Sequence, residues 1–216
     1  MAKQNTNSKQ GFTIIEVVLV LAIAGLIFLM VFVALPALQR SQRDTARRND
    51  MSRVDTSLIQ YQTNNQNTGN GDLPNGPSYW PACKDGSFTS GCATQDGTGG
   101  PQNPDVARSF VQRYMNSGTD SAVNDFKDPD GTYYGMYISE NIGGKTLAQA
   151  HITSANAANM KKDSNGFTIN SNYNTHIIFI VPGGKCSGEY VKPDTPRHFA
   201  VLYRLEGAGI YCIDDQ

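Results

Sequence analysis

Histidine and cysteine, which most often serve as metal ligands or nucleophiles, are scarce in this sequence. The three histidines, His151, His176 and His198, form no H-x-x-x-H or H-E-x-x-H spacing. The four cysteines form no C-x-x-C pair. The sequence gives no specific support for a zinc site, a thiol enzyme or a histidine base, and we expect no enzyme and no catalytic residue.

Complete phosphate-binding and calcium-binding loops are also lacking. Glycine turns followed by lysine at 143–146 and 183–185 do not fit the frame G-x-x-x-x-G-K-[ST]. Asp125, Asp128 and Asp130 resemble the start of a calcium loop, but the glutamate of its twelfth position is absent. We interpret these segments as turns and expect no cofactor and no metal, with calcium at the three aspartates as the alternative.

A strong net charge is missing as well. The chain has 18 basic and 19 acidic side chains, which give a net charge of -1. Bulk attraction to nucleic acid or anionic lipid is therefore not expected to be its main activity.

Charged side chains are absent from one long apolar run, VVLVLAIAGLIFLMVFVAL at 17–35. At roughly 1.5 Å per residue, a helix of this length nearly spans the ~30 Å hydrocarbon core of a bilayer. A secretory signal peptide has a shorter apolar core and a small-x-small cut site, which residues 34–36 do not supply. The run predicts a membrane-spanning helix, and a simple signal anchor is one alternative.

Glu16 lies at the start of this helix, where an intramembrane charge needs a partner or a function. The run GFTIIEVVLVLAIAGL resembles the N-terminal motif of type IV prepilins, including pseudopilins, over about the first thirty residues. The resemblance implies that prepilin peptidase cuts after Gly11 and that Phe12 becomes the N-methylated first residue. It also implies that Glu16 is the assembly residue. Gln10 departs from the basic residue that is more usual before the glycine.

The resemblance further implies a pilin-like α+β fold, in which a long N-terminal helix packs on a small antiparallel β-sheet head. The implied partners are other copies in a helical homopolymer, prepilin peptidase, the pilus assembly machinery and the inner membrane before assembly. The expected function is that of a structural subunit of an extracellular pilus filament, which supports adhesion, motility or DNA uptake. A minor pilin, a secretion pseudopilin and an unprocessed membrane-anchored binding module are the alternatives.

The helix is expected to continue beyond the membrane. Pro36 lies where the span should end, and it predicts a kink or a locally melted stretch. Near-helical spacing of apolar residues predicts an amphipathic continuation to about Gln62, followed by a segment rich in Asn, Gly and Pro. We expect a leader at 1–11, a transmembrane and filament-core helix at 12–38, an amphipathic helix at 39–66 and a head at 67–216.

Five arginines gather in the amphipathic part, at positions 40, 43, 47, 48 and 53. Asp44 lies four residues from Arg40 and from Arg48, and Asp50 lies three from Arg53, which are spacings that stabilise a helix. We interpret this part as a solvated, self-neutralising surface. DNA capture is the alternative, although no aromatic residues are interleaved with the arginines.

In the head, runs rich in β-branched and aromatic residues predict strands at 132–139, 175–181, 198–205 and 209–213, the last two joined as a hairpin. A short helix is expected at 105–115, and a weak helix or irregular excursion at 145–162.

The cysteines at 83, 92, 186 and 212 all follow the apolar segment, which suits two disulfides in an oxidising exterior. The simplest first pairing, Cys83 with Cys92, closes a small loop. Pairing Cys186 with Cys212 would resemble the disulfide-bounded C-terminal region of many pilins. Four cysteines allow three connectivities, so the alternatives stay open.

Overall fold

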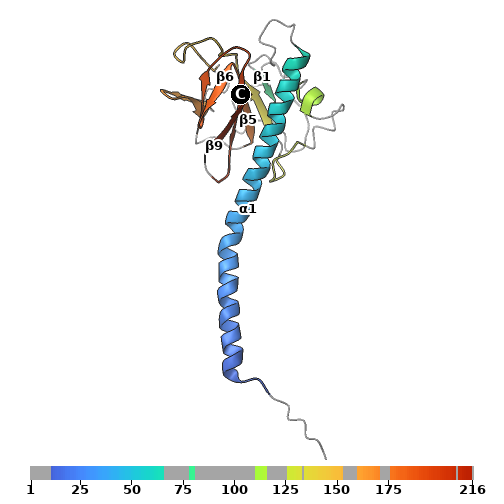
Figure 1. Ribbon diagram of the computed structural model, residues 1–216, viewed down its shortest axis with the longest axis vertical. Coiled ribbons are helices and arrows are strands. Elements are labelled where there is room, and N and C mark those ends of the chain that lie inside the picture. Colours follow the sequence, from blue (N-terminus) through green and yellow to red (C-terminus); the bar gives the residue numbers. More distant parts are fainter. Residues whose placement is uncertain are drawn as a thin grey trace, which may run out of the picture. The chain divides into compact units, whose positions relative to one another are not determined.

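The computed structural model describes residues 11–65, 78–80, 110–115, 126–132, 134–152, 160–170, 176–207 and 209–215. Contacts divide the chain into two compact units, Met1–Ser41 and Gln42–Gln216. One helix, α1 (Ile14–Asn64), begins in the first unit and ends in the second (Figure 1). Each unit is considered by itself below.

Helix α1 is helical on both sides of Pro36, so the locally melted stretch expected there is not present. The kink stays a prediction. At the other end, the backbone N–H and the side-chain amide of Asn65 both donate to the carbonyl of Tyr61, at 3.1 and 2.8 Å. These bonds close the last turn where the Asn- and Gly-rich sequence begins, two residues beyond the expected end.

The strands of the second unit form two sheets. The strands are β1 (Ser78–Trp80), β2 (Gly135–Ile138), β3 (Met160–Asp163), β4 (Gly166–Ile169), β5 (Ile177–Pro182), β6 (Gly184–Ser187), β7 (Tyr190–Pro193), β8 (Phe199–Arg204) and β9 (Ile210–Asp214). The larger sheet has the order β1-β2-β5-β8-β9, and the smaller has the order β3-β4-β7-β6. The four predicted strands correspond to β2, β5, β8 and β9.

The expected α+β layout of a long helix and a largely antiparallel β head is confirmed, but β2 and β5 run parallel. The segment between them contains β3 and β4, so the chain leaves the larger sheet and returns to it in the same direction. The hairpin of β8 and β9 is confirmed: these strands pair antiparallel, and Leu205 N–H donates to the Gly209 carbonyl at 3.2 Å.

One hydrophobic core lies between α1 and the larger sheet. Met51, Val54 and Leu58 of α1 are fully buried, and they share a cluster with Ile178 and Ile180 of β5. Every second residue of β8 joins the same cluster, as the two-residue repeat of a strand requires. The second half of α1 therefore covers one face of this sheet.

A second core lies on the other face of the larger sheet. Phe179 and Val181 of β5 alternate with the helix-facing isoleucines and pack with Phe167 of β4 and Val191 of β7. Helix α1 and the smaller sheet cover opposite faces of the larger sheet, so side chains on both sides of β5 are buried. This explains why the sequence of β5 is apolar at consecutive positions. Burying one such side chain stabilises the fold by roughly 1.5–3 kcal/mol.

The segments predicted at 105–115 and 145–162 differ in part from the structure. The helix predicted at 105–115 appears among the described residues as a short π-helical turn, η1 (Val111–Met115), preceded by helical Phe110. Its aromatic side chains do pack on α1, since Phe110 and Tyr114 lie 5.8 and 5.2 Å from the ring of Tyr61. Residues 143–150 form turns, and β3 follows at Met160, so the described part of 145–162 is irregular and then extended.

Candidate functional site

The segment before α1 holds the predicted processing residues. Gly11, Phe12 and Thr13 precede the helix and are exposed to solvent. A Cβ atom added to Gly11 would meet nothing within 4 Å. The fold of the chain therefore does not itself require glycine at this position, and any such requirement comes from outside the subunit.

Thr13 starts the helix. Its carbonyl accepts hydrogen bonds from the backbone N–H groups of Glu16 and Val17, at 3.1 and 3.3 Å, and its hydroxyl donates to Glu16 Oε2 at 3.4 Å. Threonine followed three residues later by glutamate is a known helix-start spacing. The sequence reasoning did not assign a role to Thr13, although the T-x-x-E pattern could have identified it.

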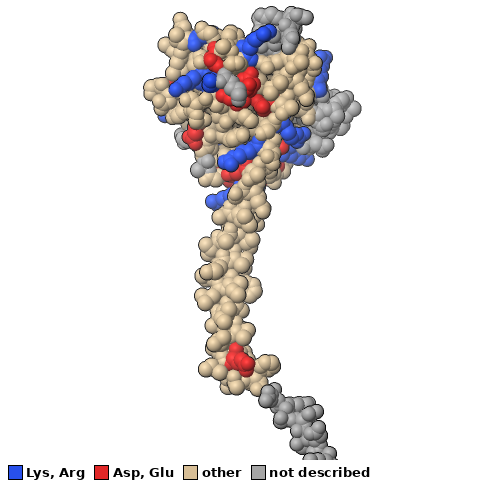
Figure 2. Space-filling view, viewed as in Figure 1, with Lys and Arg blue, Asp and Glu red and all other residues tan. Residues whose placement is uncertain are grey.

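Glu16 is the only charged side chain between Gly11 and Gln39. It lies in the first turn of α1, where the positive end of the helix dipole favours a carboxylate. Figure 2 shows this stretch as an uncharged surface with one acidic patch. Glu16 is exposed within the subunit, and it has no cationic partner among the described residues.

The apolar side chains of the first unit are exposed rather than packed. Phe12 is 86% exposed and Leu29 67%, and the other large apolar residues of this stretch are exposed as well. By length and composition α1 could cross a membrane. Exposing so much contiguous apolar surface to water is unfavourable, so this unit needs either lipid or other protein against it.

A buried ion-pair cluster centred on Arg47 connects α1 to the sheets within the second unit. Arg47 donates two hydrogen bonds to the carboxylate of Asp128, at 2.6 and 2.7 Å, and the exposed fractions of the two side chains are 4% and 0%. Its Nη1 also contacts Asp44 at 3.1 Å and Glu206 at 3.2 Å. The hydrogen bonds that Arg47 donates to Asp128, together with the charge of that carboxylate, outweigh desolvation and raise the pKa of Arg47.

The turn between β8 and β9 binds the same part of α1. Arg43 donates two bonds to Glu206, at 2.6 and 2.7 Å, which lowers the pKa of that carboxyl to about 2. Asp44 accepts from the backbone N–H groups of Glu206 and Gly207, at 2.9 and 2.8 Å. The interpretation of this helix as a solvated surface was therefore wrong at Asp44 and Arg47, which are buried and bind the head.

The structure adds long-range partners to the charges of this region. Asp44 bonds Arg47, three residues on, and two backbone N–H groups of the turn between β8 and β9. Asp50 and Arg53 do pair, at 3.7 Å. Arg48 and Arg53 also stack over Tyr211 and Phe126 at 5.7 and 5.5 Å. Because nearby groups engage most of the arginines, their field is weaker than the sequence suggests.

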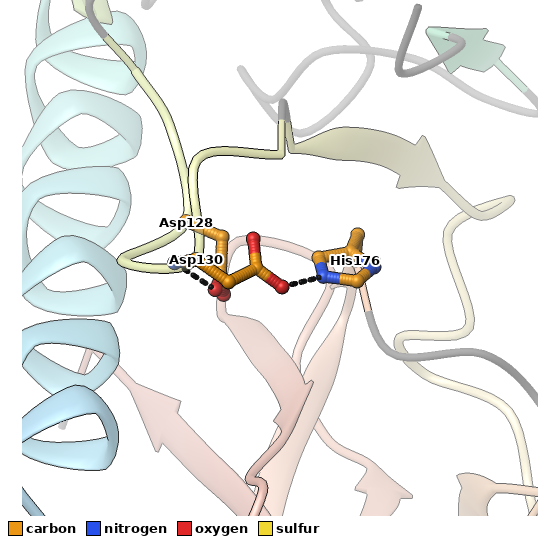
Figure 3. Close-up of side chains that lie close together, drawn as sticks. All are labelled: Asp128, Asp130 and His176. Carbon is orange, nitrogen blue, oxygen red and sulfur yellow. Dashed lines mark hydrogen bonds and ion pairs between the residues drawn. The ribbon is translucent and has the colours of Figure 1, made fainter. Parts of the chain in front are cut away.

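The turn at 128–131 confirms the interpretation as a proline-aspartate turn. Gly131 N–H donates to the carbonyl of Asp128 at 2.8 Å, and Gly131 has a φ of 90°, which favours glycine. His176 Nε2 lies 2.7 Å from Asp130 Oδ2, and the carboxylates of Asp128 and Asp130 lie near the same imidazole (Figure 3). Asp125 lies outside the described residues.

Asp128, Asp130 and His176 each place one potential ligand atom within 4.8 Å of the others. Arg47 holds both carboxylate oxygens of Asp128, and Tyr203 donates a further bond to Oδ2 at 2.8 Å. A cation here would compete with a guanidinium for the same oxygens. The geometry fits a structural ion-pair cluster better than a metal centre.

The two glycine turns pack against each other. Gly183 lies against the backbone of Gly143 and donates to the carbonyl of His198 at 2.6 Å. Gly144 N–H donates to the carbonyl of Asp194 at 2.7 Å, and His198 Nδ1 lies 2.6 Å from the carboxylate of Asp194. These N–H groups are used within the fold, so the interpretation as structural turns is confirmed.

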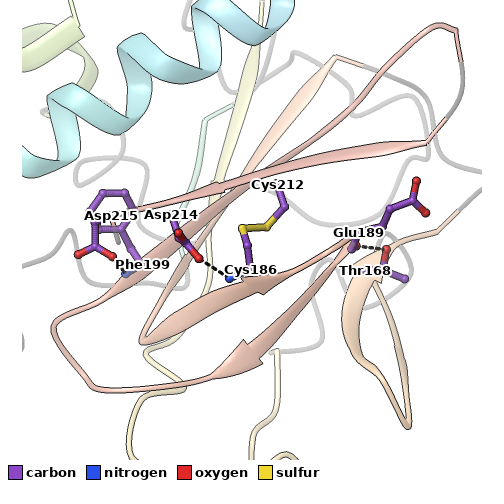
Figure 4. The surroundings of a disulfide bond; sticks show 7 residues. All are labelled: Thr168, Cys186, Glu189, Phe199, Cys212, Asp214 and Asp215. Carbon is purple, nitrogen blue, oxygen red and sulfur yellow. Dashed lines mark hydrogen bonds between the residues drawn. A yellow bond between two sulfur atoms is a disulfide. The ribbon is translucent and has the colours of Figure 1, made fainter.

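Cys186 of β6 and Cys212 of β9 form a disulfide, with their Cα atoms 5.8 Å apart. The bond confirms this predicted pairing and joins the edge strands of the two sheets (Figure 4). Next to it, Cys186 N–H donates to Asp214 Oδ2 at 2.7 Å. Cys83 and Cys92 lie outside the described residues, and their pairing stays a prediction.

Comparison with known proteins identifies the N-terminal segment. The family model of the prokaryotic N-terminal methylation motif matches residues 6–32, which contain Gly11, Phe12 and Glu16. Searches of curated proteins and of solved structures gave no match. The motif is the type IV prepilin signature, and it is followed here by an exposed apolar helix and an α+β head. The chain therefore carries the N-terminal signature of a type IV pilin-like or pseudopilin-like precursor.

Proposed function

We propose that the chain is a structural subunit of a type IV pilus, processed by prepilin peptidase and polymerised through the first half of α1. In this proposal the bond after Gly11 is cut, Phe12 is N-methylated and the subunit moves from the cytoplasmic membrane into an extracellular filament. The observation that carries the proposal is a methylation motif followed directly by an apolar helix without packing partners in its own chain.

The chemistry of the new N-terminus supports this proposal. Cleavage before Phe12 creates a cationic amine four residues from the carboxylate of Glu16. In a low-dielectric filament core, Glu16 of one subunit pairs with the amine of a neighbour. A subunit docked out of register leaves both charges buried and unpaired, at a cost of several kcal/mol. The pair therefore sets the position of each subunit.

Intact-mass measurement tests the proposal on the full chain expressed in a bacterium with a type IV assembly system. The expected mature mass lacks residues 1–11 and carries one added methyl group. Gly11→Val should block cleavage. Gly25→Val is the matched control, because a Cβ at either glycine meets nothing within 4 Å. An unprocessed wild-type N-terminus would contradict the proposal and favour a membrane-anchored binding module.

A minor pilin or secretion pseudopilin has the same motif and the same processing. Subunit abundance in sheared surface filaments distinguishes these roles, since a major pilin forms most of the filament mass. We assign adhesion, motility or DNA uptake to the assembled filament, and we assign no catalytic role to the subunit.

A further inference from the structure

Lysines gather on the outer face of the smaller sheet. Lys185 of β6 and Lys192 of β7 lie directly opposite each other in the antiparallel register, and both are exposed. Their neighbours Cys186 and Val191 face the core between the sheets. Because side chains alternate along a strand, the two lysines point away from that core. Figure 2 shows basic side chains beside an acidic patch where Figure 1 places β6.

Lys161 of β3 extends this surface. It is exposed and pairs in register with Thr168, the residue after core-facing Phe167. Two positions further along β6 and β7, Ser187 and Tyr190 pair and supply hydroxyl groups on the same side as the two lysines. We call this set the basic face; it consists of Lys161, Lys185, Lys192, Ser187 and Tyr190.

The lysines of the basic face have no ion-pair partner within the described part of the chain. Lys161, Lys185 and Lys192 make no ion pair or hydrogen bond there, whereas the nearby carboxylates of Asp163 and Glu189 accept from backbone N–H groups at 2.7 and 3.1 Å. Like charges directly opposite each other destabilise a strand pair. An anionic group bound between Lys185 and Lys192 would remove that repulsion.

We propose that the basic face binds an extended carboxylated or sulfated polysaccharide. A flat sheet surface accommodates an extended chain, the lysines bind its anionic groups, and the hydroxyls of Ser187 and Tyr190 bond its sugar hydroxyls. The disulfide between Cys186 and Cys212 fits an oxidising exterior, where such polymers occur. This activity is separate from polymerisation.

Two other polyanions fit less well. Single-stranded nucleic acid is bound by stacking on several exposed aromatic rings, and the basic face has one half-buried ring, Tyr190. An anionic bilayer is bound by faces that also insert large apolar side chains. Within the described residues of Gln42–Gln216, the only exposed large apolar side chain is Ile59 of α1.

Binding can be measured with the full chain in a non-ionic detergent, using polygalacturonate as the probe and uncharged dextran for comparison. Lys185→Gln and Lys192→Gln should each weaken polygalacturonate binding roughly two- to five-fold at low salt, as expected for one exposed charge pair. Lys145→Gln is the matched control, because Lys145 is an exposed lysine outside the basic face. It should leave binding unchanged.

Three results would overturn the proposal. They are unchanged binding after both substitutions in the basic face, an equal loss with Lys145→Gln, and binding of single-stranded DNA in place of polygalacturonate. Thermal unfolding of each variant checks that the head is intact. Because the assay uses detergent-solubilised subunits, its outcome does not depend on whether the chain forms pili.

Discussion

At the scale of single residues, Glu16 and Arg47 are both charged groups on α1, but their surroundings differ. Arg47 finds its counter-charges within the subunit, on Asp128, Asp44 and Glu206. Glu16 finds none within the described residues. A charge satisfied within the subunit stabilises the fold, and one left unsatisfied is available for assembly.

Glu16→Ala should leave the head folded and abolish or strongly reduce filament formation. The reason is that Glu16 belongs to the unit Met1–Ser41, whereas both hydrophobic cores belong to Gln42–Gln216. In the proposed assembly, the neighbour's N-terminal amine would lose its counter-charge. Filament yield in sheared fractions is the measurement, with processing checked by mass. Glu16→Gln separates charge from side-chain size, and filaments at wild-type yield from both variants would rule out the assembly role.

Arg47→Met should lower the free energy of unfolding of the head by about 3–5 kcal/mol, because it leaves the buried carboxylate of Asp128 without a counter-charge. Urea unfolding followed by circular dichroism measures the loss. Arg48→Met, at an exposed position on the same helix, serves as the control and should cost less than about 1 kcal/mol. A cost no greater than that of the control would show that the cluster does not stabilise the head.

Asp55 should destabilise the head at neutral pH. Its Oδ1 is buried without a hydrogen-bond partner, and desolvation, together with Asp215 and Asp214, raises its pKa to about 6. A folded-state pKa above the unfolded value near 3.9 means that ionisation costs stability, and this cost disappears as the pH falls below about 6.

Asp55→Asn should therefore stabilise the head at pH 7 by up to about 1 kcal/mol, after discounting for solvent screening, and have little effect near pH 4. Thermal melts at both pH values provide the measurement.

Asp130→Asn is a control that should change stability in the opposite direction. Burial opposes the ionisation of Asp130, but hydrogen bonds from Thr132 and His176 lower its pKa overall. Its ionised form thus stabilises the head above the unfolded pKa, so Asp130→Asn should cost stability at pH 7. Equal effects of Asp55→Asn at the two pH values would exclude the charge explanation.

At the scale of elements, the smaller sheet depends on its contact with the larger one. Strands β3, β6 and β7 have four residues each and expose Lys161, Lys185 and Lys192 on the outer side. A sheet of four such short strands gains much of its stability by packing its apolar face against another layer. The disulfide between β6 and β9 holds the two layers together covalently.

Replacing Cys186 and Cys212 together by serine should lower stability by about 3 kcal/mol in the chain-entropy model, for a sequence separation of 26 residues. Hydrogen exchange should rise first in β6 and β9, the strands that the bond connects. Ser187→Ala, an exposed change in the same strand, is the control. If exchange in β6 and β9 keeps its wild-type rate, the bond does not hold the layers together.

At the scale of the whole molecule, the two units expose different surfaces. Met1–Ser41 exposes its apolar side chains, whereas Gln42–Gln216 contains both hydrophobic cores. A chain that begins at Gln42 should therefore stay folded and monomeric without detergent. The full chain should need detergent or lipid.

Sedimentation of both chains, with and without detergent, checks this difference. The amphipathic half of α1 keeps its contacts with the head in the shortened chain, including the bonds of Arg43 to Glu206. Aggregation of the shortened chain would show that the head needs the first unit for folding.

The N-terminal segment could be predicted from local sequence because its role depends on residue types at fixed spacing. Gly11, Phe12 and Glu16 followed by an uncharged run were sufficient to identify the family motif, and the motif does not depend on packing. The long helix, β2, β5, β8, β9 and the final hairpin were also predicted, because their apolar runs are long enough to indicate buried strands.

Only the tertiary structure decided how the head is layered and which charges pair. Strands β3, β4, β6 and β7 were missed, since short segments containing lysine or glycine become strands only when the larger sheet packs against them. Arg47 was interpreted as solvated because local spacing offered nearby aspartates, whereas its main partner, Asp128, lies 81 residues away in sequence. Local sequence therefore determined the N-terminal methylation motif, while long-range packing determined the fold and the basic face of the head.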